Sequence, residues 1–276
     1  TTAQPGQFIC VYLGDAQSIA SPREVTPPDT VNALIGASLK PSLILPRPFS
    51  IMHVADEYFD ILFKVVGIGT SILAKVSIGQ QLRIIGPLGN SFEWDEDADI
   101  AVLVAGGIGV APFPFWAQRL KEAGHDVVVF IGARNCNELP VTPIAHEDAR
   151  IQALNTSLEA RIFAELGVPS AIAVEEPMPG AFTGTVVDML ISWLNAHSHL
   201  RPIIYACGPK AMLQRVQMVL RERNLRGQFS LEERMACGIG LCLGCACLVR
   251  DLATQQLRYQ MVCTDGPVFD ADAIVF

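Results

Sequence analysis

The sequence lacks the features that mark secreted, membrane-spanning and nucleic-acid-binding proteins. Its N-terminus has no basic start followed by an apolar stretch, so no signal peptide is expected. No run of Lys or Arg accompanies the formal charge of -8, which argues against a nucleic-acid partner. The most apolar window, 100–116, is broken by glycine and proline and is shorter than the ~20 apolar residues of a membrane span. With thiols but no export signal, we expect a cytoplasmic protein.

The chain of 276 residues contains no internal repeat, and half of it is apolar. This length suits two ordinary domains and a small module. Up to about residue 92, short β-patterned runs alternate with Gly and Pro, which predicts an antiparallel β-barrel. From Ile100 onward, apolar strands, glycine turns and helices alternate, which predicts an α/β domain with a parallel sheet. We therefore expect an α+β multi-domain fold, with a barrel in 1–95, an α/β domain in 96–228 and a small module in 229–276.

Two further expectations concern the barrel. The segment from Gly14 to Leu45 is polar and rich in proline at first and apolar later, so we predict a long inserted loop that covers a ligand or a partner. The first strand motif follows Thr1 almost at once, so we expect a leading strand of the barrel to be missing.

The cysteines near the C-terminus have the spacing of a metal site. Cys237, Cys242, Cys245 and Cys263 fit C-x4-C-x2-C with a distant fourth cysteine, the pattern of a plant-type [2Fe-2S] cluster. Glycines fill the gaps, which lets backbone amides turn toward an anionic cluster. A structural zinc site is the second choice. Zinc ribbons usually pair two short C-x2-C knuckles, whereas here three cysteines lie in one loop and the fourth is distant. A disulfide framework ranks third in so large a chain, and we interpret Cys247 as a buried thiol.

Two motifs of the first domain suit a phosphate and a flat ring. Arg47-Pro48-Phe49-Ser50 combines a cation, a stiff backbone, an aromatic face and a hydroxyl. Lys64 and the following Gly67-Ile-Gly69-Thr70 offer exposed amides and a hydroxyl for a pyrophosphate. Each motif alone has a plainer interpretation, as a strand entry and as a turn into a helix.

The α/β domain has glycine-rich turns where parallel strands are expected to end. Gly107 and Gly109 follow the first strand, and this arrangement lets a dinucleotide pyrophosphate approach a helix N-terminus, although such turns also serve packing alone. Arg134 follows the second strand and suits a ribose or a phosphate. The turn Cys207-Gly208-Pro209 ends a later strand, at the edge where α/β sheets present ligand-binding groups.

Taken in order, these motifs resemble the ferredoxin-NAD(P)H reductase superfamily, and more closely the electron transfer subunits of NAD-linked dihydroorotate dehydrogenase. The resemblance spans nearly the whole chain and is most specific in 233–240 and 263–269. It implies that 1–95 binds FAD, that 96–228 binds NAD(H) and that 229–276 holds the [2Fe-2S] cluster. It assigns FAD contacts to Arg47, Ser50, Gly69 and Thr70, and nicotinamide-nucleotide contacts to Gly107, Gly109, Cys207 and Gly208.

The resemblance also implies a partner and a reaction. A separate FMN-containing catalytic subunit would oxidise dihydroorotate, and electrons would pass through the cluster and FAD to NAD+ in pyrimidine biosynthesis, within a heterotetramer. Such a role needs no acid or base, so we expect no catalytic residue. One alternative is a related reductase subunit of a sulfite reductase, hydrogenase or transhydrogenase. Another, of a different class, is a zinc-stabilised binding protein with a degenerate nucleotide fold.

Overall fold

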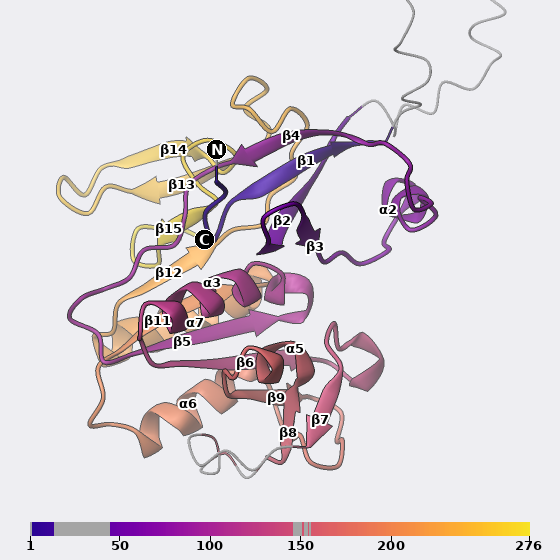
Figure 1. Ribbon diagram of the computed structural model, residues 1–276. Coiled ribbons are helices and arrows are strands. Elements are labelled where there is room, and N and C mark those ends of the chain that lie inside the picture. The colour runs from indigo at the N-terminus through magenta and orange to yellow at the C-terminus, as the bar shows by residue number, and fades with distance from the viewer. Residues whose placement is uncertain (1, 14–44, 146–150, 152–153, 155) are drawn as a thin grey trace, which may run out of the picture.

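The structure is a computed structural model that describes residues 2–13, 45–145, 151, 154 and 156–276. A small antiparallel sheet packs over a larger, mostly parallel sheet, and the C-terminal hairpin lies beside the small sheet (Figure 1). The predicted insertion between Gly14 and Leu45 lies outside the described residues, except for Leu45. In the part of the chain that is described, no helix is long and apolar enough to cross a membrane.

The small sheet has the strand order β3-β2-β1-β4, and all of its pairings are antiparallel. Its elements are β1 (Phe8–Tyr12), β2 (Arg47–Val54), β3 (Phe59–Ile61) and β4 (Arg83–Leu88), with α2 (Ile68–Leu73) between the last two. The antiparallel character predicted for the first domain is therefore confirmed. Within the described residues the sheet is open, with β3 and β4 at its edges.

Strand β1 joins two hydrophobic cores because successive side chains point to opposite faces of a sheet. Ile9 and Val11 face a core that includes Phe49. Phe8 and Cys10 face the opposite way, into a core shared with the C-terminal module. The alternation in one short strand thus fastens the first domain to the last.

The large sheet has the order β10-β9-β6-β5-β11-β12-β15. Its strands are β5 (Ile100–Gly106), β6 (Val127–Ala133), β9 (Ser170–Val174), β10 (Phe182–Thr183), β11 (Pro202–Cys207), β12 (Gly227–Ser230) and β15 (Val268–Asp270). All neighbours are parallel except β12 and β15, which pair antiparallel. The central strands are buried along nearly their whole length, which explains their continuous apolar sequences.

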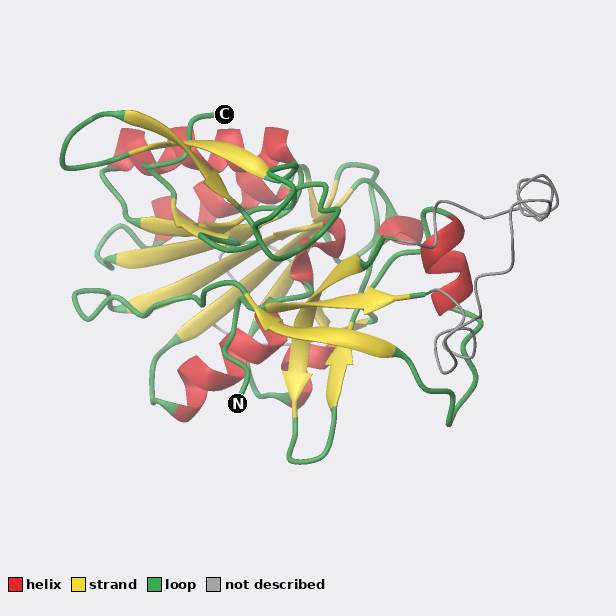
Figure 2. Ribbon diagram, turned by 90° about the horizontal axis from the view of Figure 1, so that it is seen from above, coloured by secondary structure: helices red, strands yellow, loops and turns green. Residues whose placement is uncertain are grey.

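Helices cover both faces of the large sheet (Figure 2). On one face lie α6 (Val186–Ala196) and α7 (Lys210–Arg223), and on the other α3 (Phe113–Glu122) and α5 (Arg161–Glu165). Strand order reverses beside β5, since β6 follows on one side and β11 is added on the other. The carboxyl ends of β5 and β11 therefore form a topological switch point, where open α/β sheets bind ligands.

The shorter elements lie around this frame. They are the 3-10 turns η4 (Gly107–Val110) and η5 (Cys136–Glu138), the strand pair β7 (Pro143–Ala145) and β8 (Leu158–Ala160), and the hairpin β13 (Ala246–Arg250) and β14 (Leu257–Met261). The C-terminal module returns to the large sheet through β15, which pairs with β12. Strand β12 itself runs across the predicted 228/229 boundary.

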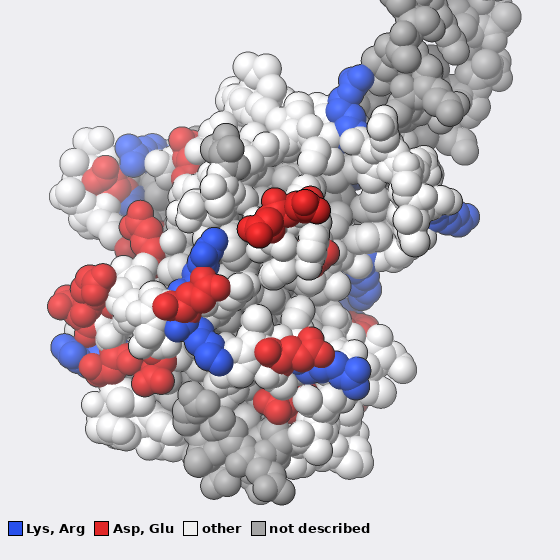
Figure 3. All heavy atoms as spheres, viewed as in Figure 1, with Lys and Arg blue, Asp and Glu red and all other residues white. Residues whose placement is uncertain are grey.

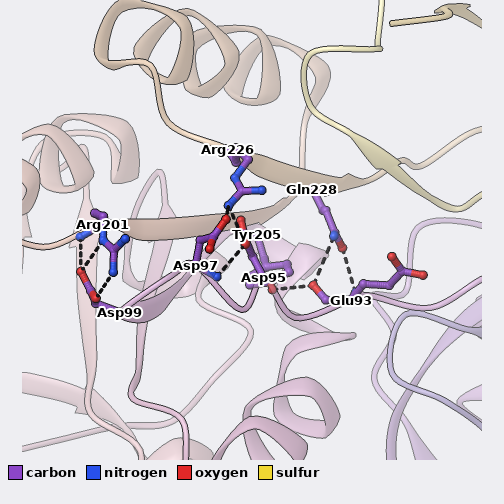
Figure 4. A network of polar contacts seen from close by, with 8 residues as sticks. All are labelled: Glu93, Asp95, Asp97, Asp99, Arg201, Tyr205, Arg226 and Gln228. Carbon is purple, nitrogen blue, oxygen red and sulfur yellow. Dashed lines mark hydrogen bonds and ion pairs between the residues drawn. The ribbon is translucent and has the colours of Figure 1, made fainter. Parts of the chain in front are cut away.

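The linker between the two sheets is bonded to the large sheet at several points (Figure 4). The Tyr205 hydroxyl donates to the Glu93 carbonyl oxygen at 2.7 Å. Arg226 pairs with Asp95 at 2.6 Å and with Asp97 at 3.0 Å. Further bonds join the pairs Arg201–Asp99 and Gln228–Glu93. These contacts fix the path of the linker and with it the orientation of the small sheet.

Charged side chains of both signs are interspersed over the face shown in Figure 3 and form no single patch there. The upper part of that face, over the small sheet, carries few charges, whereas the hairpin carries charges of both signs. The visible face therefore offers no basic stripe of the kind that tracks a nucleic-acid backbone.

Candidate functional site

A first cavity of about 420 Å³ lies between the small sheet, the switch point and the start of the C-terminal module. Its wall contains the predicted residues Arg47, Pro48, Phe49, Ser50, Lys64, Thr70 and Cys207. Phe8, Phe63, Ile108 and Met235 add apolar surface. The lining of the cavity thus combines apolar and aromatic side chains with cations and hydroxyl groups, which suits a flat ring that carries phosphates.

The guanidinium of Arg47 runs past the backbone of Gly69. A Cβ atom at Gly69 would lie 2.9 Å from Arg47 Nε, so the glycine leaves room for the Arg47 side chain in its present conformation. Arg47 also donates to the Leu45 carbonyl oxygen at 2.7 Å. Gly69 is therefore a site residue through Arg47, and it does not itself line the cavity.

Thr70 and Gly67 form the turn that starts α2. The Thr70 hydroxyl oxygen accepts hydrogen bonds from the amides of Val66 at 2.9 Å and Gly67 at 3.2 Å. Thr70 and Val66 line the first cavity, whereas Gly67 does not. The turn interpretation of this motif is therefore correct, and it places Thr70 at the cavity wall.

The far wall of the first cavity contains groups that the sequence analysis did not identify, namely Ser230 and Glu232. Burial raises the pKa of Cys207 above its ordinary value, Glu232 raises it further, and a hydrogen bond with Ser230 opposes both. Burial also raises the pKa of Glu232, although part of this residue remains exposed to solvent. The sequence signal that could have identified Ser230 and Glu232 as site residues is their position directly before the cysteine cluster.

A second cavity of about 580 Å³ lies along the carboxyl ends of β5, β6 and β9. Gly107, Pro209 and Lys64 of the predicted set line it, together with Arg134. Arg215 and Glu175 also line it and were not predicted. Arg215 pairs with Asp188 at 3.0 Å.

The glycines at the switch point have two different roles. Gly107 has φ 54 and open space where a Cβ would stand, so its missing side chain leaves the second cavity open. A Cβ at Gly109 would overlap the Cys207 carbonyl, and one at Gly208 would lie 2.9 Å from the Gly106 backbone. Gly109 and Gly208 therefore pack two strand ends together. Cys207, which we expected at the nucleotide site, lines the first cavity instead.

The two cavities share a wall made of Leu62, Phe63, Lys64 and Ile108. Residues 62–64 directly follow β3, and Ile108 belongs to η4. The two cavities therefore adjoin one another at these four residues. This is the arrangement that direct transfer between two bound cofactors needs.

The cysteine loop directs backbone amides at sulfur atoms. The Ile239 and Cys242 amides donate to Cys237 Sγ at 3.5 and 3.4 Å, and the Gly240 amide donates to Cys263 Sγ at 3.1 Å. These amides lower the pKa of Cys237 to about 6. Burial is the main reason that the pKa of Cys263 is raised to about 11. The loop thus stabilises negative charge on sulfur from the backbone side.

The four predicted ligands lie near one another. The thiol of Cys242 influences the pKa of Cys237, and the thiols of Cys245 and Cys237 influence the pKa of Cys263. Four cysteines are the ligand set that a [2Fe-2S] cluster needs. Among the described residues, no three His, Cys, Asp or Glu side chains converge as a set for one metal ion. Cys247 is buried in the core, which agrees with its interpretation as a packed thiol.

Comparison with known proteins identifies the family. Residues 232–275 match the model of the iron-sulfur cluster binding domain of dihydroorotate dehydrogenase B. The electron transfer subunit of dihydroorotate dehydrogenase B (NAD(+)) of Caldanaerobacter subterraneus subsp. tengcongensis is 35% identical over 84% of this chain and 81% of its own length. The subunit of the same name from Desulforamulus reducens is 33% identical over 95% of this chain and 90% of its own.

Among solved structures, that of an NADH-dependent reduced ferredoxin-NADP oxidoreductase matches with a TM-score of 0.70 and 24% identity, over 99% of this chain and 80% of that one. This likeness confirms the reductase fold. The cysteine spacing, the paired cavities and the two relatives agree. The chain belongs to the family of electron transfer subunits of the NAD(+)-linked dihydroorotate dehydrogenase B.

Proposed function

We propose that the chain carries electrons between NAD(H) in the second cavity and a [2Fe-2S] cluster in the cysteine loop, by way of FAD in the first cavity. The observation that carries this proposal is the order of the three sites. The cavities share a wall at 62–64 and Ile108, and the first cavity reaches Glu233 and Met235, directly before the cysteine loop. The flavin site therefore lies between the other two.

The flavin would be held by residues of the small sheet. Arg47 would bind a phosphate, with Thr70 beside it, while Pro48, Phe49 and Ser50 would line the ring. Phe49 is already fixed by Phe63, with ring centroids 5.7 Å apart. Lys64 lies at the mouth of both cavities and would face the phosphates of either ligand. Gly67 would contribute by forming the turn that starts α2, and Gly69 by leaving room for the Arg47 side chain.

The nicotinamide nucleotide would lie along the second cavity. Gly107 would let its pyrophosphate approach the backbone, and Pro209 would border it. Gly109, Gly208 and Cys207 would act by packing the ends of β5 and β11, with the Cys207 thiol on the flavin side. Arg134 and Arg215 line this cavity together with Glu138 and Glu175, so the charges of the wall do not select NAD over NADP, and the names of the relatives support NAD.

The cluster would be bound by Cys237, Cys242, Cys245 and Cys263. Bound flavin supplies the exchange between the two-electron chemistry of nicotinamide and the one-electron chemistry of a cluster. The chain's own residues bind and orient these groups, and no side chain has to act as an acid or a base. We retain the division into an FAD domain (1–95), an NAD domain (96–228) and a cluster module (229–276) as part of this proposal.

A partner subunit would meet the cluster loop. Ile239, Leu241 and Leu243 are 44%, 78% and 64% exposed, although they are apolar and lie between the cysteines. Exposed apolar groups beside a redox centre suit a protein interface. From the names of the relatives, we propose that the partner is a catalytic subunit that contains FMN and oxidises dihydroorotate, in a heterotetramer. All eight cysteines are free thiols, which supports a cytoplasmic location.

The test is to produce the chain together with a dihydroorotate-oxidising FMN subunit and to purify the complex. We expect dihydroorotate to reduce NAD+ in the complex, and NADPH to compete poorly with NADH at equal concentration. The chain alone should exchange electrons with NADH but not with dihydroorotate. A stable, iron-loaded chain that supports no dihydroorotate-driven NAD+ reduction with such a partner would contradict the proposed role.

A further inference from the structure

Asn90, in the turn after β4, binds the backbone near the fourth cysteine across a large distance in sequence. Its side-chain amide donates to the Asp265 carbonyl oxygen at 3.2 Å and to the Val268 carbonyl oxygen at 2.7 Å. Its side-chain oxygen accepts from the Val268 amide at 2.9 Å. Its own backbone amide donates to the Gly266 carbonyl oxygen at 2.7 Å. One asparagine thus makes four bonds to the segment that follows Cys263.

The segment held by Asn90 connects the cluster site to the flavin cavity. Cys263 is buried at one end, and Pro267 lines the first cavity at the other. Met261 and Asp265 close the turn around Cys263, with the Met261 amide donating to the Asp265 carboxylate at 2.6 Å. The position of Cys263 relative to the cavity is therefore set by a short, well-bonded stretch whose downstream end is fixed by Asn90.

Glycines permit close approach at two points between the small sheet and this module. Gly89 has φ 76, and a Cβ there would lie 2.5 Å from Pro267 Cδ and 2.6 Å from the Gly266 carbonyl oxygen. Gly238 has φ 71, and a Cβ there would lie 2.5 Å from Cys10 Sγ. The small sheet thus contacts both arms of the cluster site, the loop at Gly238 and the segment after Cys263.

The strands that make these contacts also belong to the flavin site. Phe8 of β1 lines the first cavity, two residues before Cys10. Because both cluster arms rest on β1 and on the turn after β4, the distance between flavin and cluster depends on this contact. Electron transfer falls steeply with distance, so a contact that fixes the distance also sets the rate.

We infer that Asn90 is a positioning residue, which holds the Cys263 arm against the small sheet and so sets the cluster at its working distance from the flavin. This inference rests on the proposed function of the two sites. A purely local role for Asn90 in closing a turn would affect folding stability but not the spectrum of the cluster or the step between flavin and cluster.

The test uses the full chain loaded with FAD and cluster, in wild type, Asn90→Ala and Asn90→Asp forms. The aspartate keeps the oxygen that accepts from Val268 and loses both side-chain donors. After mixing with NADH, we expect normal bleaching of the flavin band and bleaching of the cluster that is slowed severalfold, since electron transfer falls steeply with the distance between the two groups. The EPR signal of the reduced cluster should shift in both variants.

Asn195→Ala is the matched control, because Asn195 on α6 also accepts a hydrogen bond, from Arg223 at 2.7 Å. It should match wild type in both phases. Wild-type rates and an unshifted EPR signal in Asn90→Asp would overturn the inference. Loss of iron from Asn90→Asp with FAD retained would also overturn it. Asn90 would then be needed to bind the cluster, and not only to position it relative to the flavin. A wild-type chain without flavin or iron would instead refute the proposed function.

Discussion

At the residue scale, Arg47 is the cation that we propose as the main contact to the phosphates of the flavin. Its side chain passes Gly69 and reaches the first cavity. Replacing Arg47 by Ala removes a charge-assisted hydrogen bond to phosphate, worth about 1.5–3 kcal/mol, so FAD should bind roughly 10- to 100-fold more weakly. Quenching of flavin fluorescence during titration of the flavin-free protein measures this change.

Arg83→Ala serves as the control for that change, because Arg83 lies exposed at the start of β4, outside both cavities. It should leave FAD affinity within about twofold of wild type, since a distant surface charge contributes little through water. Equal affinities in Arg47→Ala and wild type would refute the role given to Arg47.

The cysteine loop allows a sharper comparison between two neighbouring thiols. Cys242 is exposed in the loop, whereas Cys247 is buried in the core. Cys242→Ser should lose most of its iron and the [2Fe-2S] absorption while NADH still bleaches the flavin. Cys247→Ser should keep its iron, because that thiol packs and does not bind. Iron analysis and visible spectra measure both results, and iron loss from Cys247→Ser alone would mean that the ligand assignment is wrong.

Individual residues could be predicted where chemistry and spacing are both local. The four cysteines were predicted as cluster ligands from their spacing, and the model of an iron-sulfur cluster binding domain matches residues 232–275, which contain all four. Asn90, Glu232 and Arg215 could not be predicted in the same way, because their partners are distant in sequence or reached only through the fold. Gly109 shows the opposite problem, since its motif looks like a ligand turn but the residue packs against Cys207.

At the scale of elements, periodicity predicted helices better than strands near the site. The apolar spacing after the Cys207-Gly208-Pro209 turn predicts a helix from Lys210 to Arg223, and α7 occupies those residues. The apolar run 58–66 predicts one long strand, but β3 covers only Phe59–Ile61, because the next residues form the shared cavity wall. An apolar run that faces a ligand cavity has the same pattern as one that pairs in a sheet.

Helix α6 begins with a reciprocal cap whose contribution depends on pH. The Asp188 carboxylate accepts from the Thr185 hydroxyl at 2.6 Å and pairs with Arg215. The Thr185 hydrogen bond is the main cause that lowers the pKa of Asp188. Asp188→Asn should therefore lower the free energy of unfolding by about 0.5–1 kcal/mol at pH 7, as expected for a partly exposed cap.

The sign of the pH effect follows from the lowered pKa. The stabilisation is complete above the unfolded value of about 3.9 and is lost as pH falls through the lower folded value. Urea unfolding of wild type and Asp188→Asn at pH 7 and pH 3.5 should show a smaller difference at the lower pH. A control, Asp56→Asn in the exposed turn before β3, should show little difference at either pH. A constant difference for Asp188→Asn would contradict this account.

At the scale of the whole molecule, the linker network determines how the small sheet sits on the large one. Tyr205 is fully buried and donates its hydroxyl to the Glu93 carbonyl, whereas Arg226 is 63% exposed where it pairs with Asp95. Tyr205→Phe should cost about 1–1.5 kcal/mol, because the buried ring loses one hydrogen bond while Gln228 still donates to the Glu93 carbonyl oxygen. Arg226→Ala should cost less than about 1 kcal/mol, as exposed ion pairs do. Denaturant unfolding gives both values, and the reverse order would contradict this interpretation.

The overall architecture followed from the sequence, and its connections did not. The change from β-patterned runs to strand-turn-helix units predicted the two sheets. The return of β15 to pair with β12 could not be predicted, because three residues of an antiparallel edge strand carry no distinctive pattern. That pairing matters for function, since it ties the cluster module to the nucleotide-binding sheet.

The measurement that tests the central claim most directly is an anaerobic titration of the loaded full chain with NADH, followed by visible absorption. The account predicts flavin and [2Fe-2S] bands in the resting protein and bleaching of both by NADH. It also predicts that only the flavin band is bleached in Cys242→Ser. A colourless protein that contains zinc, or flavin bleaching with no change at an intact cluster, would contradict the claim that the three sites form one electron path.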